Sequence, residues 1–160
     1  MQDMILFLSG TNCGVYIGCS QNDYGNDLDL TDLNSHQNLG NNNAVLASRI
    51  SYYLNLRGPC LSIDTSCSSS LVAIANACDN LLLKNIDVAL SGGVWVIPGP
   101  NLHVAMSQLG ALSSDGRCYA FDSRANGFVP AEGVGVIMLK RIEDARRDRD
   151  HIYAVIKGWG

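Results

Sequence analysis

Apolar residues recur along the chain in two periods, one of two residues and one near 3.6 residues. The shorter period, with runs of β-branched and aromatic residues bounded by glycine or proline, is typical of strands. The strand at residues 60–63 follows Gly58-Pro59, a pair that favours the start of a new strand. On this basis the sequence predicts five strands, at residues 14–18, 60–63, 87–91, 134–139 and 152–156.

The longer period predicts four helices, at residues 43–54, 71–82, 102–109 and 142–149. The second helix carries apolar residues on nearly every face, which predicts that it is buried in the centre of the domain. The third is expected to end at Gly110, and the fourth, with alternating charges, to present a solvated face. Strand, helix and strand follow one another over residues 60–91, which predicts a parallel α/β unit with a right-handed crossover.

Two stretches lack either period. Residues 21–43 are polar, and a loop of this length is usually functional, so we interpret it as a candidate interface or substrate-entry segment. Residues 113–132 hold several Asp and Arg residues, whose charges are expected to pair with one another.

The composition of the 160 residues, 47% hydrophobic and 16% charged, is that of one globular domain. A net charge of −4 and the lack of a basic run give no support to nucleic-acid or membrane-surface binding. The apolar run within residues 1–8 is too short for a signal peptide or a membrane span.

Six cysteines lie far apart in the sequence, with no C-x-x-C pair and no histidine at zinc-finger spacing. This spacing disfavours a metal site. With no sign of export, it indicates reduced thiols and a cytoplasmic location. The cysteines are Cys13, Cys19, Cys60, Cys67, Cys78 and Cys118.

Residues 64–70 separate the strand at 60–63 from the helix at 71–82 and place Cys67 at the turn. The three serines of the turn are expected to cap the helix, through hydroxyls that accept from its first N–H groups. Free N–H groups and the positive end of the helix dipole favour an anion, so Cys67 is a candidate nucleophile in its thiolate form. The same N–H groups are expected to stabilise an oxyanion.

A packed, unreactive thiol is the competing interpretation of Cys67, because free cysteine is among the most buried residue types. The order of strand, polar turn and helix favours the nucleophile, since it presents a side chain at the end of a sheet. The residue pattern alone leaves both interpretations open. His103 is expected to be a packed or surface residue, because no carboxylate or cysteine accompanies it at a catalytic spacing.

Residues 64–73, Asp-Thr-Ser-Cys-Ser-Ser-Ser-Leu-Val-Ala, closely resemble the active-site signature of β-ketoacyl synthase domains, particularly those of modular polyketide synthases. Other segments resemble the family in the family's order. They are residues 55–59, 89–94, 112–118, 121–122, 126–130 and 132–135. Together the segments cover almost all of residues 14–158, an extent that chance similarity does not explain.

This resemblance implies an α/β, thiolase-like fold with layered α-β-α-β-α architecture built from two similar halves. It implies that Cys67 carries an acyl chain as a thioester. Separately from the resemblance, the stretch at residues 113–132 is a candidate loop shaping an acyl tunnel, with Phe121 and Phe128 as walls, although turns held by Asp and Arg hydrogen bonds are the default interpretation. The implied reaction, in polyketide or fatty-acid biosynthesis, is a decarboxylative Claisen condensation. The acyl group passes from the phosphopantetheine arm of an acyl carrier protein to Cys67. A malonyl-type extender on the carrier then loses carbon dioxide, and the resulting carbanion attacks the thioester.

The resemblance also implies the partners. They are an acyl carrier protein, acyl and malonyl-type thioesters, and a second copy in a homodimer of the complete domain. No cofactor or metal is expected to be bound by the chain itself, since phosphopantetheine arrives on the carrier.

The chain departs from the family pattern at several positions. The family's two decarboxylation histidines and its lysine belong to motifs absent here, and His36, His103 and His151 do not stand in those contexts. The family's opening segment is also absent. We therefore expect residues 1–160 to form a partial domain, without its start and C-terminal half, that exposes apolar surface and is inactive alone. Ser66 and Ala131 stand where alanine and glycine are common, and both changes are expected to be tolerated.

Two alternative functions stay open. The first is a non-catalytic scaffold or dimerisation remnant, in which Cys67 is only a packed thiol. The second is a related thiolase or chain-initiating acyltransferase, which keeps the nucleophile and changes the reaction.

Overall fold

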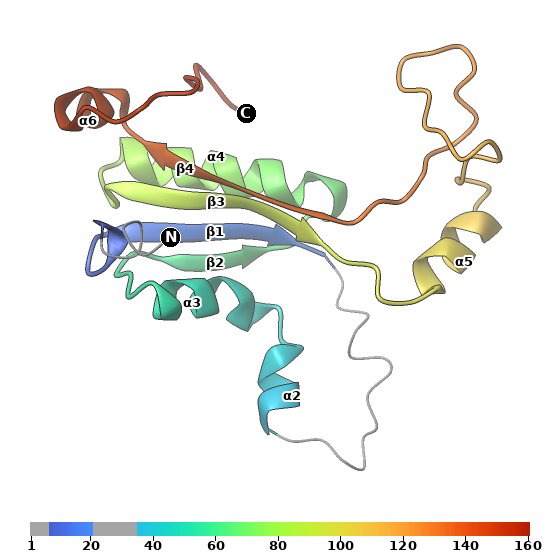
Figure 1. Cartoon of the computed structure of the whole chain (residues 1–160), viewed down its shortest axis with the longest axis horizontal. Helices are drawn as coiled ribbons and strands as arrows, with labels where there is room; N and C mark the ends of the chain where they lie inside the picture. The colour runs from blue at the N-terminus through green and yellow to red at the C-terminus, as the bar shows by residue number, and fades with distance from the viewer. Residues whose placement is uncertain (1–6, 21–34) are drawn as a thin grey trace.

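The computed structural model describes residues 7–20 and 35–160, which form a four-stranded mixed sheet with helices on both faces (Figure 1). The strand order is β2-β1-β3-β4. β1 pairs in parallel with both β2 and β3, whereas β4 is antiparallel to β3. The strands are β1 (Cys13–Cys19), β2 (Cys60–Ile63), β3 (Val88–Trp95) and β4 (Gly133–Lys140).

Five α-helices and one short 3-10 helix, η2, accompany the strands in the described residues. They are α2 (Ser35–Gly40), α3 (Ala44–Tyr53), η2 (Ser66–Ser68), α4 (Ser69–Leu82), α5 (Asn101–Gln108) and α6 (Ile142–Asp148). β2, α4 and β3 follow one another, and both strands pair in parallel with β1, which confirms the parallel α/β unit.

β1 is the centre of the molecule, because all seven of its residues are buried. Tyr16 faces α4 and packs with Ala73 and Ala77, while Val15 and Ile17 face α3. Successive residues of a strand point to opposite faces, so the apolar run of β1 supplies both layers of the core at once. The described residues thus form three layers, α3, sheet and α4, where the resemblance implies five for the complete fold.

The prediction that α4 is buried on all sides is wrong. Its buried stripe is narrow, and Leu71 and Leu82 are 70% and 65% exposed. The sheet covers only one side of the helix, so these apolar side chains on its other side remain in solvent. Together with Val134 and Met138 of β4, 75% and 54% exposed, they confirm the expectation of exposed apolar surface.

The predicted strand at residues 152–156 is also wrong, because this segment forms neither strand nor helix. The indole N–H of Trp159 donates to Asp79 of α4, at 3.0 Å. Trp159, which follows the segment, therefore contacts a helix. Residues 152–156 form no ladder with the sheet, and without a partner strand a run of β-branched and aromatic residues has no ladder hydrogen bonds for its backbone.

Most charged residues of the predicted helical segment at 142–149 are exposed, which confirms its solvated face. Asp144 is the exception, and it pairs with Arg141, which directly precedes α6. The side chains of Arg141 and Asp144 are each only 13% exposed and form an ion pair at 2.6 Å. Arg141 also donates to the carbonyls of Leu81 and Ile86, at 3.0 and 2.6 Å. Arg141 therefore joins the end of α4, the start of β3 and α6.

The structure tests the expectations for the two irregular stretches to different extents. Residues 21–34 of the first lie outside the described residues, and the rest of that stretch contains α2. In the second stretch Asp122 and Arg124 pair at 2.9 Å, as expected.

Gly110 follows α5 with a φ of 66°, which agrees with its predicted role as the helix end. Among the described helices none is long and apolar enough to cross a membrane.

Candidate active site

The turn between β2 and α4 has the predicted order of strand, sharp turn and helix. β2 ends at Ile63, Cys67 occupies the middle of η2, and α4 begins at Ser69. Cys67 is exposed, as a free thiol. Ser66, directly before it, has a φ of 57°, a left-handed conformation that a non-glycine residue adopts only when its surroundings hold it.

Two glycines bring the start of α4 close to the sheet. A Cβ added to Gly18 of β1 would lie 2.5 Å from the backbone of Ser69 and Ser70, and one added to Gly93 of β3 would lie 2.8 Å from the Ser70 Cβ. Both glycines therefore permit an approach that any larger residue would prevent. In the sequence they indicate only strand ends, because the facing helix is not visible there.

The serines of the turn do not cap the helix, which makes that prediction wrong. Ser68 donates to the Thr65 carbonyl at 2.8 Å, and Ser69 donates to the Ser66 carbonyl at 2.6 Å. No side chain caps η2 or α4. The hydroxyls bind the turn to itself and give α4 no side-chain cap, and the first N–H of the helix, that of Ser69, donates to the Ser66 carbonyl.

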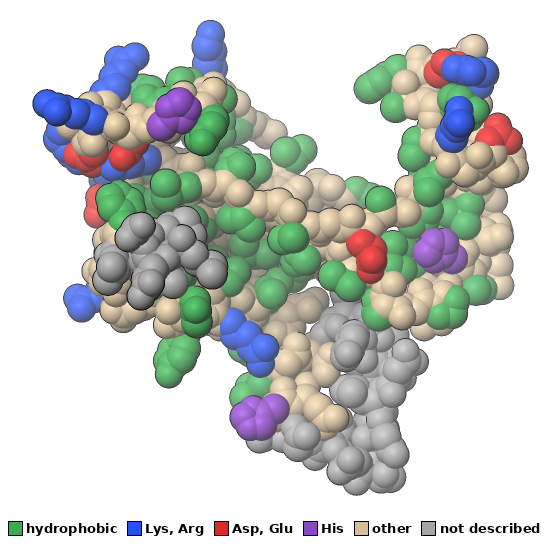
Figure 2. All heavy atoms as spheres, in the orientation of Figure 1, with side chains coloured by type: hydrophobic (Ala, Val, Ile, Leu, Met, Phe, Trp, Pro, Cys, Tyr) green, Lys and Arg blue, Asp and Glu red, His purple; other side chains and the backbone are tan. Residues whose placement is uncertain are grey.

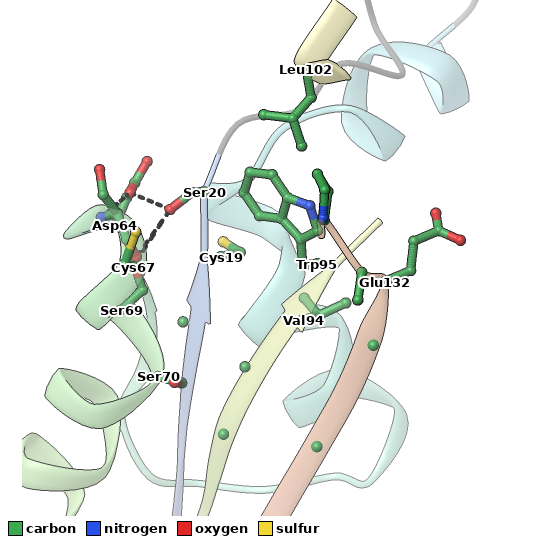
Figure 3. Close-up of a pocket in the computed structure, with 18 of the residues that line it drawn as sticks. Cys19, Ser20, Asp64, Cys67, Ser69, Ser70, Val94, Trp95, Leu102 and Glu132 are labelled. Carbon is green, nitrogen blue, oxygen red and sulfur yellow. Dashed lines mark hydrogen bonds between the residues drawn. The ribbon is translucent and has the colours of Figure 1, made fainter. Parts of the chain in front are cut away.

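Asp64 and Ser20 connect this turn to the end of β1. The Ser20 hydroxyl donates to Asp64 Oδ1 at 2.7 Å, and the Ser66 N–H donates to the same oxygen at 3.0 Å (Figure 3). These hydrogen bonds, with that from Ser20 the larger cause, lower the pKa of Asp64. The sequence pattern places Asp64 in this turn but predicts no role for its carboxylate, and it does not single out Ser20. The one signal in the sequence was position. Asp64 directly follows the predicted strand at 60–63, and Ser20 lies two residues after the predicted strand at 14–18.

A cleft of about 1070 Å³ lies at the carboxyl ends of the parallel strands, with Cys67 on its wall. Its other wall is an arm made of α5 and the loop through residue 132, which stands away from the sheet (Figure 1). The space-filling view is hollowed between sheet and arm, with apolar side chains along the hollow (Figure 2). The larger apolar side chains of the lining are Ile74, Trp95, Leu102, Met106, Phe128 and Ile137.

The two predicted tunnel residues separate in the structure. Phe128 lines the cleft, whereas Phe121 is fully exposed on the arm and lines no part of it. Tyr119 and Phe121 both have positive φ values, so the chain reverses sharply there and turns Phe121 outward. The expectation for Phe121 as a cleft wall is therefore wrong.

None of the three histidines, all of which lie in described residues, lines the cleft. His36 and His103 are exposed on α2 and α5. His151 is exposed and packs edge-on against Tyr153, with ring centroids 4.5 Å apart. In this structure no histidine is therefore in a position to act on a group held at Cys67.

The other cysteines differ from Cys67 in their surroundings. Cys19 also lines the cleft but is buried, and burial, followed by the nearby charge of Asp64, raises its pKa. Cys13 is fully buried, and its burial raises its pKa to about 11. Cys118 is exposed on the arm, where its sulfur accepts from the Val129 N–H at 3.3 Å. Across the described residues no group of three metal-ligating side chains gathers.

Comparison with known proteins decides the family. The profile of the family described as "Beta-ketoacyl synthase, N-terminal domain" matches residues 5–145. The chain belongs to the β-ketoacyl synthase family. It is 49% identical over 153 residues to polyketide synthase PksL of Bacillus subtilis, covering 96% of this chain and 3% of that protein. It is 47% identical over 153 residues to one component of the phenolphthiocerol/phthiocerol polyketide synthase of Mycobacterium tuberculosis, covering 94% of this chain and 8% of that protein.

Solved ketosynthases have the same fold. A ketosynthase from module 6 of the bacillaene synthase of Bacillus subtilis is 48% identical with a TM-score of 0.83, over 93% of this chain and 25% of that one. The oxazolomycin ketosynthase domain of Streptomyces albus is 34% identical with a TM-score of 0.79, over 92% and 26%. These likenesses confirm the thiolase-like fold class and the relationship to polyketide synthases. The chain spans about a quarter of the solved ketosynthases and a small part of the curated synthases.

Proposed function

We propose that this chain is the acyl-accepting part of a polyketide-type β-ketoacyl-[acyl-carrier-protein] synthase and that Cys67 is the acyl acceptor. The observation that carries the proposal is the position of Cys67. It is an exposed thiol at the uncapped start of α4, on the wall of a largely apolar cleft, in a chain of the ketosynthase family.

The proposed first half-reaction is thioester exchange. The Cys67 sulfur attacks the carbonyl carbon of an acyl thioester on a carrier protein's phosphopantetheine, and backbone N–H groups of the turn around Cys67 stabilise the oxyanion. The new sulfur–carbon bond forms as the old one breaks, and the pantetheine sulfur leaves and takes up a proton. The acyl chain then lies along the apolar wall that includes Ile74 and Phe128.

The second half-reaction, in the complete synthase, is the condensation. A malonyl-type extender loses carbon dioxide, and its carbanion attacks the Cys67 thioester, so that a carbon–carbon bond forms and the cysteine sulfur leaves. Decarboxylation needs residues that stabilise the developing carbanion, and no histidine of this chain lines the cleft. We therefore propose that this chain alone loads an acyl group without condensing it, and that the complete domain works as a homodimer.

The test is incubation of the chain with an acyl-pantetheine thioester, followed by intact-protein mass spectrometry, beside a Cys67→Ala variant. Acylation of the original chain but not of the Cys67→Ala variant supports the acceptor role. Equal acylation of both would contradict it, and acylation of neither would favour the non-catalytic scaffold. Release of carbon dioxide from malonyl-pantetheine by the chain alone would contradict the proposal that this chain loads an acyl group without condensing it.

A further inference from the structure

The carboxylate of Asp64 lies at the centre of the hydrogen bonds that shape the turn before Cys67. One of its oxygens accepts from the Ser20 hydroxyl at 2.7 Å and from the Ser66 N–H at 3.0 Å. Ser20 follows the last residue of β1, and Asp64 follows the last residue of β2. These two bonds therefore join the carboxyl ends of two neighbouring strands to the residue next to Cys67 (Figure 3).

Ser66 is the residue that this arrangement constrains. Its φ of 57° is uncommon for a serine, so the conformation persists only because surrounding contacts fix it. The N–H of Ser66 is held by Asp64, and its carbonyl accepts from the Ser69 hydroxyl at 2.6 Å. Both ends of one strained residue are thus held by side chains, and the direction of the next residue, Cys67, depends on them.

Ser69 extends the same network to α4. Its hydroxyl accepts from the Thr65 N–H at 2.9 Å and lies 3.4 Å from the Ser20 hydroxyl. Ser69 is 5% exposed, so its bonds form away from bulk water, where an unpaired group would be costly. The turn is therefore connected on one side to the sheet and on the other to the helix.

We infer that Asp64 is a positioning residue for Cys67, acting as a hydrogen-bond acceptor that holds Ser66 in its left-handed conformation and so directs the thiol and the adjacent N–H groups into the cleft. Asp64 touches no reacting atom in this role. The inference rests on the proposed function for its effect on acyl transfer. A small error in the placement of a nucleophile is expected to lower the reaction rate strongly while leaving substrate binding almost unchanged.

The test compares Asp64→Ala, which removes the acceptor, with Asp64→Asn, which keeps an acceptor oxygen and removes the charge. Asp122→Ala is the matched control. Asp122 also accepts from an N–H two residues later, that of Arg124 at 2.9 Å, but it lies outside the cleft. Each variant is incubated with acyl-pantetheine, and the maximal acylation rate and the half-saturating concentration are measured.

Asp64→Ala is expected to lose at least about tenfold in maximal rate at a nearly constant half-saturating concentration. Asp64→Asn is expected to stay within about threefold of the original chain, and Asp122→Ala to match it. A folded Asp64→Ala variant with the original rate would overturn the inference. So would Asp64→Asn falling as far as Asp64→Ala, because the charge rather than the acceptor geometry would then be responsible.

Two further measurements keep the test decisive. Circular dichroism shows whether Asp64→Ala folds. If it does not, Ser20→Ala takes its place, with a severalfold loss of rate expected and an unchanged rate contradictory. Alkylation of Cys67 by iodoacetamide needs no acyl chemistry. If the original chain takes up no acyl group, the proposed function fails. The positioning role is then judged by alkylation alone. Slower alkylation of Cys67 in Asp64→Ala than in Asp64→Asn supports that role, and equal alkylation rates overturn it.

Discussion

Gly18 of β1 lies so close to Ser69 of α4 that a Cβ on the glycine would be 2.5 Å from the serine's carbonyl carbon. Replacing Gly18 by alanine must push the start of α4 away from the sheet, and overpacking of this kind costs about 1–3 kcal/mol. We predict a lower free energy of unfolding in urea and slower acylation of Cys67. Gly99→Ala is the control, because a Cβ there meets nothing within 4 Å. Equal stability of the two variants would refute the close approach.

Arg141 is predicted to be the ionic side chain on which stability depends most. Its guanidinium donates to two main-chain carbonyls and to Asp144, and only 13% of the side chain is exposed. Arg141→Ala removes all of these hydrogen bonds from a largely buried site, so we expect a loss of about 2–3 kcal/mol in the free energy of unfolding. Arg147, 66% exposed in the same cluster, is the control, and its replacement by alanine is expected to have a much smaller effect.

Acid is predicted to destabilise the fold through its paired carboxylates. Hydrogen bonds from Arg147 and then Lys140 lower the pKa of Asp148 to about 2, and those from Arg141 lower the pKa of Asp144. A carboxylate whose pKa is lowered by folding contributes stability above its unfolded pKa and loses it as the pH falls toward the folded value. Urea midpoints should therefore fall from about pH 5 toward pH 2.

Asp148→Asn tests this assignment, because the amide does not titrate. The variant is expected to be less stable than the original chain at pH 7 and to show a shallower loss of stability on acidification. An identical slope for the two proteins would mean that Asp148 takes no part in the acid transition.

Phe128 and Phe121 provide a matched pair for the cleft. Phe128 lines it and Phe121 does not, although both are phenylalanines on the same arm. Phe128→Ala is predicted to slow acylation by long-chain thioesters more than by acetyl thioester, since only the longer chain reaches the arm. Phe121→Ala should change neither rate. A loss of long-chain acylation in Phe121→Ala alone would show that the arm is oriented differently.

The histidines are predicted to be dispensable for loading. His36, His103 and His151 lie away from the cleft, so replacing each by alanine should leave the rate of Cys67 acylation within experimental error. A histidine variant that loads acyl groups several times more slowly would show that the cleft has another arrangement in solution.

Much of the sheet could be predicted from the sequence, because β1, β2, β3 and β4 each carry a dense local pattern. The errors arose where the outcome depends on a partner distant in the sequence. Leu71 and Leu82 are exposed because the sheet covers only one side of α4, which the helix sequence does not show. Residues 152–156 form no strand because no neighbouring strand pairs with them. Cys67 stood out through its turn and its family resemblance.

The supporting residues of the site were harder to predict than Cys67. Ser20 is separated from Asp64 by 44 residues, and nothing in either local sequence shows that they meet. For the serines of the turn, the local sequence predicted a role that the structure does not show. Their sequence is typical of caps, yet Ser68 and Ser69 use their hydroxyls as donors to the turn.

The most direct test of the central claim is the location of the acyl group. After incubation with an acyl-pantetheine thioester, trypsin releases the peptide of residues 58–84, which contains Cys60, Cys67 and Cys78, and fragmentation distinguishes the three. We predict that the acyl mass lies on Cys67 alone. An acyl group on Cys60, Cys78 or any other cysteine instead, or none on Cys67, would contradict the account.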